Sequence, residues 1–138
     1  MQRVISSFIA GACFLASTCA QAQGSFGSSF GTPELLPPEQ AFVVSQPEAD
    51  VIVITIAKGT YLYDERTMVQ NGSGDILKTQ RSESTIYDDP LFGPTPIHKK
   101  ALRMKVSDAP NLMVLTYQGC ADIGFCYPPQ QTELSFSR

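Results

Sequence analysis

The sequence predicts an all-β domain, a sandwich or a barrel. Short segments with strand character follow one another, and ten prolines and ten glycines are spread between them. No long stretch keeps the hydrophobic period of a helix. Short strands separated by turn-forming residues are typical of sandwiches and barrels, in which each strand buries one face against a second layer.

Five segments carry the strand signal: 51–57, 61–63, 102–106, 112–117 and 134–137. The first is a β-branched apolar run, which is typical of a strand covered on both faces. In the third, apolar and basic residues alternate, which predicts one buried and one solvated face. Asn71-Gly72-Ser73-Gly74 predicts a turn, and Pro37-Pro38 predicts an extended entry into the domain.

The N-terminal segment predicts an export signal. Arg3 supplies a positive charge, residues 4–16 form an apolar core, and Ala20-Gln21-Ala22 offers a cleavage site between small residues. Cys13 and Cys19 would leave with this segment, and the product would be periplasmic and would not span a membrane.

The sequence predicts that the chain is divided into three parts. We expect residues 1–22 to be a signal peptide, residues 23–34 a flexible Gly/Ser-rich tail, and residues 35–138 the folded domain.

Charge and composition exclude several functions. The net charge is -3, and no block of basic residues occurs beyond His98-Lys99-Lys100, which argues against nucleic-acid binding. His98 is the chain's one histidine and, beside two lysines, is expected to be solvated. Two cysteines remain after the signal, too few to form a four-ligand zinc shell alone, so we expect no metal site and no cofactor. Nothing in the spacing places the one histidine near a cysteine, which argues against a Cys–His hydrolase.

The most informative segment surrounds the last two cysteines. A strand leads into Cys120, five residues separate it from Cys126, and Pro128-Pro129 precedes the next strand. Opposed residues on antiparallel strands have α-carbons about 4.5–5.5 Å apart, a distance that a disulfide accepts. The two cysteines can therefore bridge the mouth of a hairpin, where Gly119 and Gly124 give the backbone freedom.

The residues alone leave the role of this pair open. Most disulfides in exported domains brace the fold. However, closing a loop of about seven residues contributes only roughly 2–2.5 kcal/mol, and a short-loop bridge can open without unfolding the domain. A structural bridge and a redox pair therefore both remain possible.

A resemblance to a known protein family favours the redox pair over the structural bridge. The run from Tyr117 to Pro129 closely resembles the active-site loop of the N-terminal periplasmic domain of the thiol:disulfide interchange protein DsbD family. Segments 36–42, 59–63 and 89–93 resemble, in the same order, that domain's entry segment, aromatic strand motif and cap loop. The resemblance spans roughly residues 35–137.

The resemblance implies an immunoglobulin-like β-sandwich with the cysteine pair on a loop between two late strands. It implies a thiol–disulfide oxidoreductase of the protein-disulfide reductase type, with a place in cytochrome c maturation. Electrons would come from a membrane thiol carrier or a thioredoxin-like donor and pass to a periplasmic disulfide isomerase or thioredoxin-like acceptor. By position, Cys126 matches the cysteine that forms mixed disulfides with partners, and Cys120 the one that resolves them.

The resemblance also implies a set of residues around the pair. Tyr61, Tyr63 and Asp89 match residues that surround the cysteines in the family. Without the resemblance, the two tyrosines suit ordinary strand packing and Asp89 an ordinary turn.

The cap loop departs from the family pattern. Where the family has an acidic residue and then an aromatic one, this sequence has Pro90 and Leu91, with Phe92 next. We expect Leu91, helped by Phe92, to shield the pair from stray oxidants. The missing carboxylate puts a proton-handling role at Pro90 in doubt.

The family joins this domain to a membrane carrier and a thioredoxin-like domain, whereas this sequence ends at Arg138; we expect a free-standing relay or, alternatively, a fragment. The main alternative function is an exported binding module with a structural disulfide. Copper handling by the thiols with methionines is disfavoured, because Met68, Met104 and Met113 are not clustered.

Overall fold

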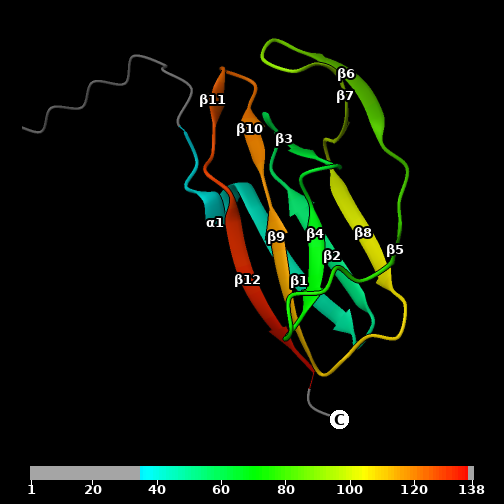
Figure 1. Cartoon of the computed structure of the whole chain (residues 1–138). Coiled ribbons are helices and arrows are strands. Elements are labelled where there is room, and N and C mark those ends of the chain that lie inside the picture. The colour runs from blue at the N-terminus through cyan, green and yellow to red at the C-terminus, as the bar shows by residue number, and fades with distance from the viewer. Residues whose placement is uncertain (1–34, 137–138) are drawn as a thin grey trace, which may run out of the picture. The chain divides into compact units, whose positions relative to one another are not determined.

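The structure, a computed structural model, describes residues 35–136, which form twelve strands and one short helix (Figure 1). The predicted signal peptide and tail, and the last two residues of the predicted domain, lie outside the described residues. In chain order the elements are α1 (Pro38–Ala41), β1 (Phe42–Glu48), β2 (Val51–Ile56), β3 (Thr60–Tyr63), β4 (Met68–Asn71), β5 (Thr79–Arg81), β6 (Thr85–Asp89), β7 (Gly93–His98), β8 (Ala101–Val106), β9 (Leu112–Tyr117), β10 (Gly119–Ala121), β11 (Phe125–Cys126) and β12 (Gln130–Ser135).

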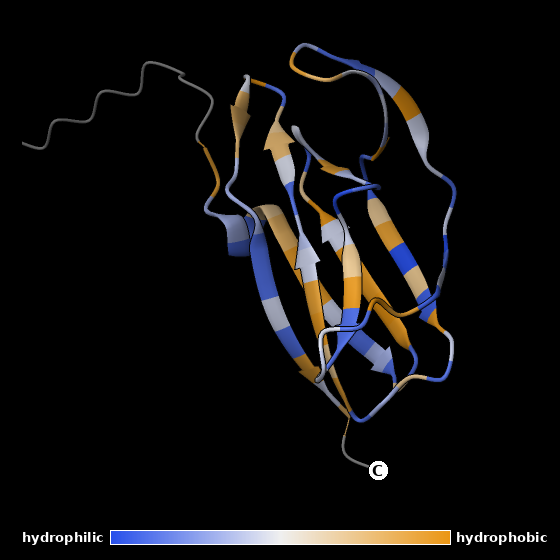
Figure 2. Ribbon diagram, viewed as in Figure 1, coloured by the Kyte–Doolittle hydropathy of each residue, from blue (hydrophilic) through white to orange (hydrophobic). Residues whose placement is uncertain are grey.

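The strands form three antiparallel sheets, two of which make a sandwich. Their strand orders are β1-β2-β8-β5, β12-β9-β4 and β11-β10-β3-β7-β6. One cluster of buried apolar side chains combines Ile54 and Leu102 of the first sheet with Val69 and Leu115 of the second. These two sheets therefore pack face to face, and the apolar strands in Figure 2 mark the interior between them. The fold is a sandwich rather than a barrel.

Burial along the strands follows the predicted patterns, with one correction. On β8, buried Leu102, Met104 and Val106 alternate with exposed residues, as predicted. The prediction that the run at β2 is covered on both faces is wrong, because Thr55 is exposed and Val53 is only partly buried. One face of this sheet lies against the core, so alternate side chains of β2 point outwards.

The entry segment also differs from its prediction. Pro37 is extended, with φ -64° and ψ 153°, but Pro38 opens helix α1. Proline fits the first position of a helix because its missing N–H would have no helical partner there. The Tyr127 hydroxyl donates to the Leu36 carbonyl at 2.7 Å and so ties this entry to the chain after the second cysteine.

The third sheet carries the cysteines at one end of the sandwich (Figure 1). All four residues of its strand β3 are buried. Leu62 belongs to the main core, whereas Tyr61 and Tyr63 point to the other face, into a small cluster with Cys120. Strand β3 therefore packs against the main core on one face and against the cysteine pair on the other.

His98 corrects a further prediction. Its side chain is buried rather than solvated, because His98 pairs with Leu62 of β3 inside the five-stranded sheet. Its Nε2 lies 2.8 Å from Oδ1 of Asp64, which also pairs with Arg81 at 3.2 Å. The neighbouring lysines remain exposed. Within residues 35–136, no helix has the length and apolar character of a membrane span.

Candidate redox site

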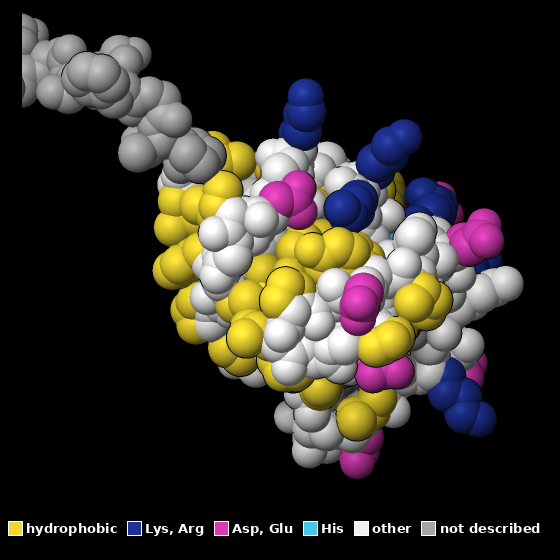
Figure 3. Space-filling model, turned by 90° about the horizontal axis from the view of Figure 1, so that it is seen from above, with side chains coloured by type: hydrophobic (Ala, Val, Ile, Leu, Met, Phe, Trp, Pro, Cys, Tyr) yellow, Lys and Arg dark blue, Asp and Glu magenta, His cyan; other side chains and the backbone are white. Residues whose placement is uncertain are grey.

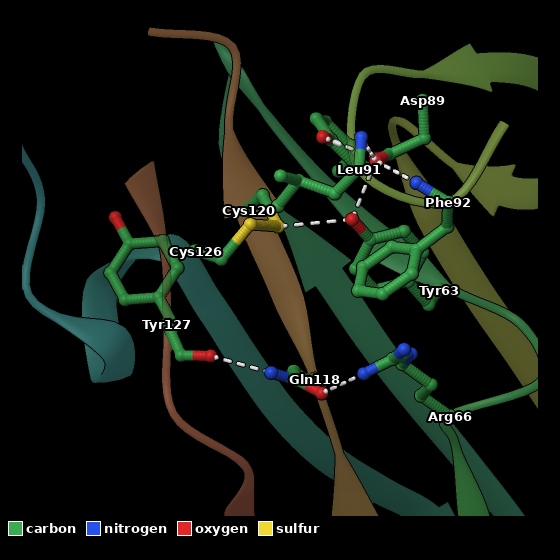
Figure 4. Close-up of a disulfide and its surroundings, with 10 residues drawn as sticks. Tyr63, Arg66, Asp89, Leu91, Phe92, Gln118, Cys120, Cys126 and Tyr127 are labelled. Atoms are coloured by element: carbon green, nitrogen blue, oxygen red, sulfur yellow. Dashed lines mark hydrogen bonds between the residues drawn. A yellow bond between two sulfur atoms is a disulfide. The ribbon is translucent and has the colours of Figure 1, made fainter. Parts of the chain in front are cut away.

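The two cysteines lie opposite each other on a β-hairpin. Cys120 of β10 and Cys126 of β11 are register partners whose α-carbons are 4.0 Å apart. The Tyr127 N–H donates to the Gly119 carbonyl at 3.0 Å, which puts the cysteines at a position without mutual hydrogen bonds. Opposed α-carbons are closest at such positions. The two sulfurs are bonded as a disulfide, as the sequence predicts (Figure 4).

The connection between the two strands explains how the chain turns so tightly. Residues 122–124 form the loop, in which the Gly124 N–H donates to the Ala121 carbonyl at 3.0 Å and Gly124 has φ +87°. A three-residue hairpin commonly ends on a residue in this left-handed region. Glycine adopts that conformation without a steric penalty, so the sequence supplies the residue that the hairpin needs.

The two sulfur-bearing residues differ in exposure. Cys120 is fully buried, whereas Cys126 is partly exposed. Cys126 lines a small cavity of about 110 Å³ together with Tyr61, Asp89, Pro90, Leu91 and Gly124. An incoming group therefore meets Cys126 first.

Behind the disulfide lies a buried network of two tyrosines and one carboxylate. The hydroxyls of Tyr61 and Tyr63 donate to Oδ2 of Asp89, at 2.9 Å and 2.6 Å. The Tyr63 hydroxyl also lies 3.2 Å from Sγ of Cys120. The structure thus brings together at the disulfide three residues that the sequence singled out from two distant segments.

The network fixes the protonation of its members near neutral pH. Burial raises the pKa of both tyrosines, that of Tyr63 to about 12, and for Tyr63 the hydrogen bond to Asp89 adds to the rise. Burial also opposes charge on the Asp89 carboxyl. Hydrogen bonds from Tyr63, the Leu91 N–H, Tyr61 and the Phe92 N–H outweigh that effect and hold the pKa of Asp89 below its usual value. Two protonated hydroxyls therefore face a carboxylate.

The cap loop is anchored by the same carboxylate. Oδ1 of Asp89 accepts hydrogen bonds from the N–H groups of Leu91, at 2.8 Å, and Phe92, at 3.2 Å. Figure 4 shows the Leu91 side chain lying over the two sulfurs. The Phe92 ring lies instead edge-on to Tyr63, with the centroids 5.7 Å apart. Pro90 is exposed and lines the cavity beside Cys126.

Comparison with known proteins identifies the family. A family model described as thiol:disulfide interchange protein DsbD, N-terminal, matches residues 32–137. The chain belongs to this family. Among curated DsbD proteins, that of Neisseria meningitidis serogroup A is 35% identical over 113 residues, covering 75% of this chain and 19% of the relative. That of Salmonella typhi is 32% identical over 114 residues, covering 78% and 20%. The chain thus spans about a fifth of the length of these DsbD relatives.

Solved structures of DsbD N-terminal domains confirm the immunoglobulin-like sandwich. The reduced form from Neisseria meningitidis has a TM-score of 0.66 and 33% identity, and the match covers 75% of this chain and 90% of that one. A second, in complex with the PilB N-terminal domain, has a TM-score of 0.60 and 32% identity, covering 74% and 87%. As predicted, the cysteine pair of this family member lies on a late hairpin.

Two residues at the DsbD-like site escaped the sequence analysis. Nη1 of Arg66 donates to Oε1 of Gln118 at 2.9 Å, and Arg66 also stacks on Phe92. Arg66 follows the aromatic strand motif by three residues, and Gln118 lies inside the cysteine segment. Neither carries a local pattern, because their contacts depend on how separate loops meet.

Proposed function

We propose that this domain is a periplasmic thiol–disulfide exchange relay, a thiol–disulfide oxidoreductase that works through reversible opening of the Cys120–Cys126 disulfide. The observation that carries this proposal is the unequal exposure of the pair: Cys126 is open to a cavity and Cys120 is sealed. A bridge whose role is purely structural gains nothing from one accessible sulfur, whereas exchange requires access to one sulfur.

The exchange runs in two balanced steps. The reduced Cys126 thiolate attacks a sulfur of the partner's disulfide, a mixed disulfide forms, and the partner's other sulfur leaves as a thiolate. Cys120 then gives up its proton, which the partner's first thiolate takes up, and attacks Sγ of Cys126. This step re-forms the internal disulfide and releases the partner's second sulfur as a thiolate, which is protonated by solvent. Two electrons have moved to the partner, and a dithiol donor returns them by the reverse sequence.

The buried network gives the two thiols different characters. The Tyr63 hydroxyl has one proton, which it donates to the Asp89 carboxylate. In the reduced state its oxygen is then left to accept a hydrogen bond from the thiol of Cys120, 3.2 Å away in the disulfide form. This arrangement and the nearby negative charge favour the thiol form of Cys120, so Cys126 is the sulfur available for attack.

The end of the domain that carries the site suits a protein partner. Figure 3 views this end and shows hydrophobic side chains grouped between charged ones. Leu91, Phe92, Ile123 and Phe125 are apolar and exposed here, with Leu91 68% and Ile123 53% exposed. An apolar patch with a polar rim is typical of a protein-binding surface.

Donors and acceptors of this chemistry are proteins with paired cysteines. We expect a membrane thiol carrier or thioredoxin-like domain as donor, and a periplasmic isomerase or thioredoxin-like protein, including one of cytochrome c maturation, as acceptor. Two relatives support this: one DsbD N-terminal domain occurs in the reduced form, and another in complex with the PilB N-terminal domain. The export signal predicted at the N-terminus of the sequence supports a periplasmic location.

Trapping tests the proposal. Cys120→Ala leaves Cys126 without its resolving partner, so expression in a bacterial periplasm should accumulate mixed disulfides that dithiothreitol releases. Cys126→Ala is the matched control, because Cys120 is buried and should capture far less. Equal capture by both variants, or none by Cys120→Ala, would overturn the proposal.

A further inference from the structure

Arg66 lies against the cap loop, and its charged group contacts aromatic rings rather than a carboxylate. It is an exposed residue of the loop between β3 and β4. Its guanidinium carbon is 4.1 Å from the centroid of the Phe92 ring and 5.3 Å from that of Tyr63. Arg66 takes part in none of the ion pairs found within residues 35–136. Its contacts there are with two aromatic faces and one amide.

That amide holds the guanidinium in place. Nη1 of Arg66 donates to Oε1 of Gln118 at 2.9 Å. Nε2 of Gln118 in turn donates to the carbonyl of Tyr127 at 3.0 Å, the residue that follows Cys126. Figure 4 shows this chain of contacts running from Tyr127, through Gln118, to Arg66 beside the cap loop. Gln118 therefore links the position of the Arg66 guanidinium to the segment that follows Cys126.

The Phe92 side chain contacts two residues of the domain, Tyr63 and Arg66. It is 49% exposed and meets the domain at the edge of Tyr63 on one side and at Arg66 on the other. Its neighbour Leu91 is 68% exposed and lines the cavity at Cys126. Because the two residues are adjacent in the chain, a force that holds Phe92 down also holds Leu91 over the sulfurs.

We propose that Arg66 is a positioning residue that clamps the cap loop over the Cys120–Cys126 pair by stacking on Phe92. This inference rests on the proposed function, since it assigns to one side chain the control of access to the reacting sulfur. A planar guanidinium suits the role better than an ammonium, because it can stack on a ring while donating to Gln118. A partner that displaces Phe92 breaks the stack and widens access to the partly exposed Cys126.

The exposure of the Arg66–Phe92 contact determines how strongly it shifts the equilibrium between the closed and open cap loop. An arginine–aromatic contact at an exposed site shifts an equilibrium by roughly two- to five-fold, and by more where it is desolvated. Since Phe92 is about half exposed, loss of the clamp should raise the open population of the loop by about that factor. Leu91 lines the cavity at Cys126 and restricts the approach to its sulfur, so attack on the disulfide by a small reagent should accelerate as the open population of the loop rises.

The test is the rate at which dithiothreitol reduces the disulfide in the oxidised full chain. We expect Arg66→Met to be reduced about two- to five-fold faster than the wild type, and Arg66→Lys to fall between them. Arg103→Met is the matched control, because Arg103 is an exposed arginine on β8 whose ion-pair partner is Glu48 at 3.6 Å. Its rate should equal that of the wild type.

A double-mutant cycle separates the clamp from a general loosening. In a Phe92→Leu background, Arg66→Met should add no further acceleration, because the stacking partner is already gone. Unchanged rates in Arg66→Met, or an equal acceleration in both backgrounds, would overturn the clamp. The reductant is a small molecule, so this result does not depend on any protein partner: a failure of partner trapping with an intact cycle would remove the relay and leave the clamp.

Discussion

The Asp89 carboxylate is the point where the disulfide surroundings and the cap loop meet, so Asp89→Asn is the most informative single change. The asparagine oxygen can still accept from the N–H groups of Leu91 and Phe92. Its amide nitrogen then faces the hydroxyls of Tyr61 and Tyr63, which in the wild type donate to a carboxylate oxygen. The substitution preserves shape and removes the charge.

The expected loss follows from the hydrogen bonds. Bonds to charged groups contribute roughly 1.5–3 kcal/mol each, against roughly 0.5–1.5 kcal/mol for neutral ones. The two tyrosine bonds lose their acceptor and the two amide bonds lose their charge. We therefore expect the free energy of unfolding to fall by about 2–4 kcal/mol near neutral pH.

The lowered pKa of Asp89 determines how the stability difference between the wild type and Asp89→Asn changes with pH. The folded-state pKa of Asp89 is lowered, so the carboxylate's contribution is present above the usual carboxyl pKa of 3.8 and is lost as the pH falls through the lower folded-state value. Urea unfolding of the oxidised protein should thus show a large gap between wild type and Asp89→Asn at neutral pH, narrowing on acidification below about pH 4. The exposed neighbour gives the control, since Asp88→Asn should change little. A gap that stays constant down to acid pH would refute the reasoning.

Two further predictions concern the strands beside the disulfide. Gly119→Ala should destabilise the domain by about 1–3 kcal/mol or more in urea unfolding, because the new methyl group would collide with the Tyr61 carbonyl and the Phe42 ring. Gly72→Ala is the control, because a methyl group there would make only an ordinary contact with Leu112. An unchanged unfolding midpoint for Gly119→Ala would contradict this packing. The pKa of Tyr63 is raised to about 12, so its contribution to stability should persist up to about pH 10 and be lost as the pH rises towards 12. Unfolding measured across that range should show a loss that Tyr63→Phe reduces, whereas an equal loss in the variant would argue against it.

Local patterns predicted much of the fold. Alternation on β8 and the glycine-bearing turn before Phe125 are properties of neighbouring residues, so period and turn chemistry identify them. The hairpin geometry of Cys120 and Cys126 follows from the short stretch of five residues between them and needs no distant contact.

The site's network depends on topology instead. Asp89 reaches Tyr61 and Tyr63 because β7 pairs with both β6 and β3, a strand order that spacing does not contain. The resemblance to a known loop, not periodicity, placed these three residues at the pair. His98 misled for a related reason: its lysine neighbours predict solvent, but its pairing inside the sheet buries it beside Asp64.

The reduction potential of the Cys120–Cys126 pair tests the central claim most directly. The full chain would be equilibrated in a series of dithiothreitol redox buffers, and its free thiols counted by alkylation. We predict a potential above about -300 mV, in the range in which thioredoxin-like proteins exchange electrons. A potential below about -300 mV, typical of structural bridges, would contradict this account of the site.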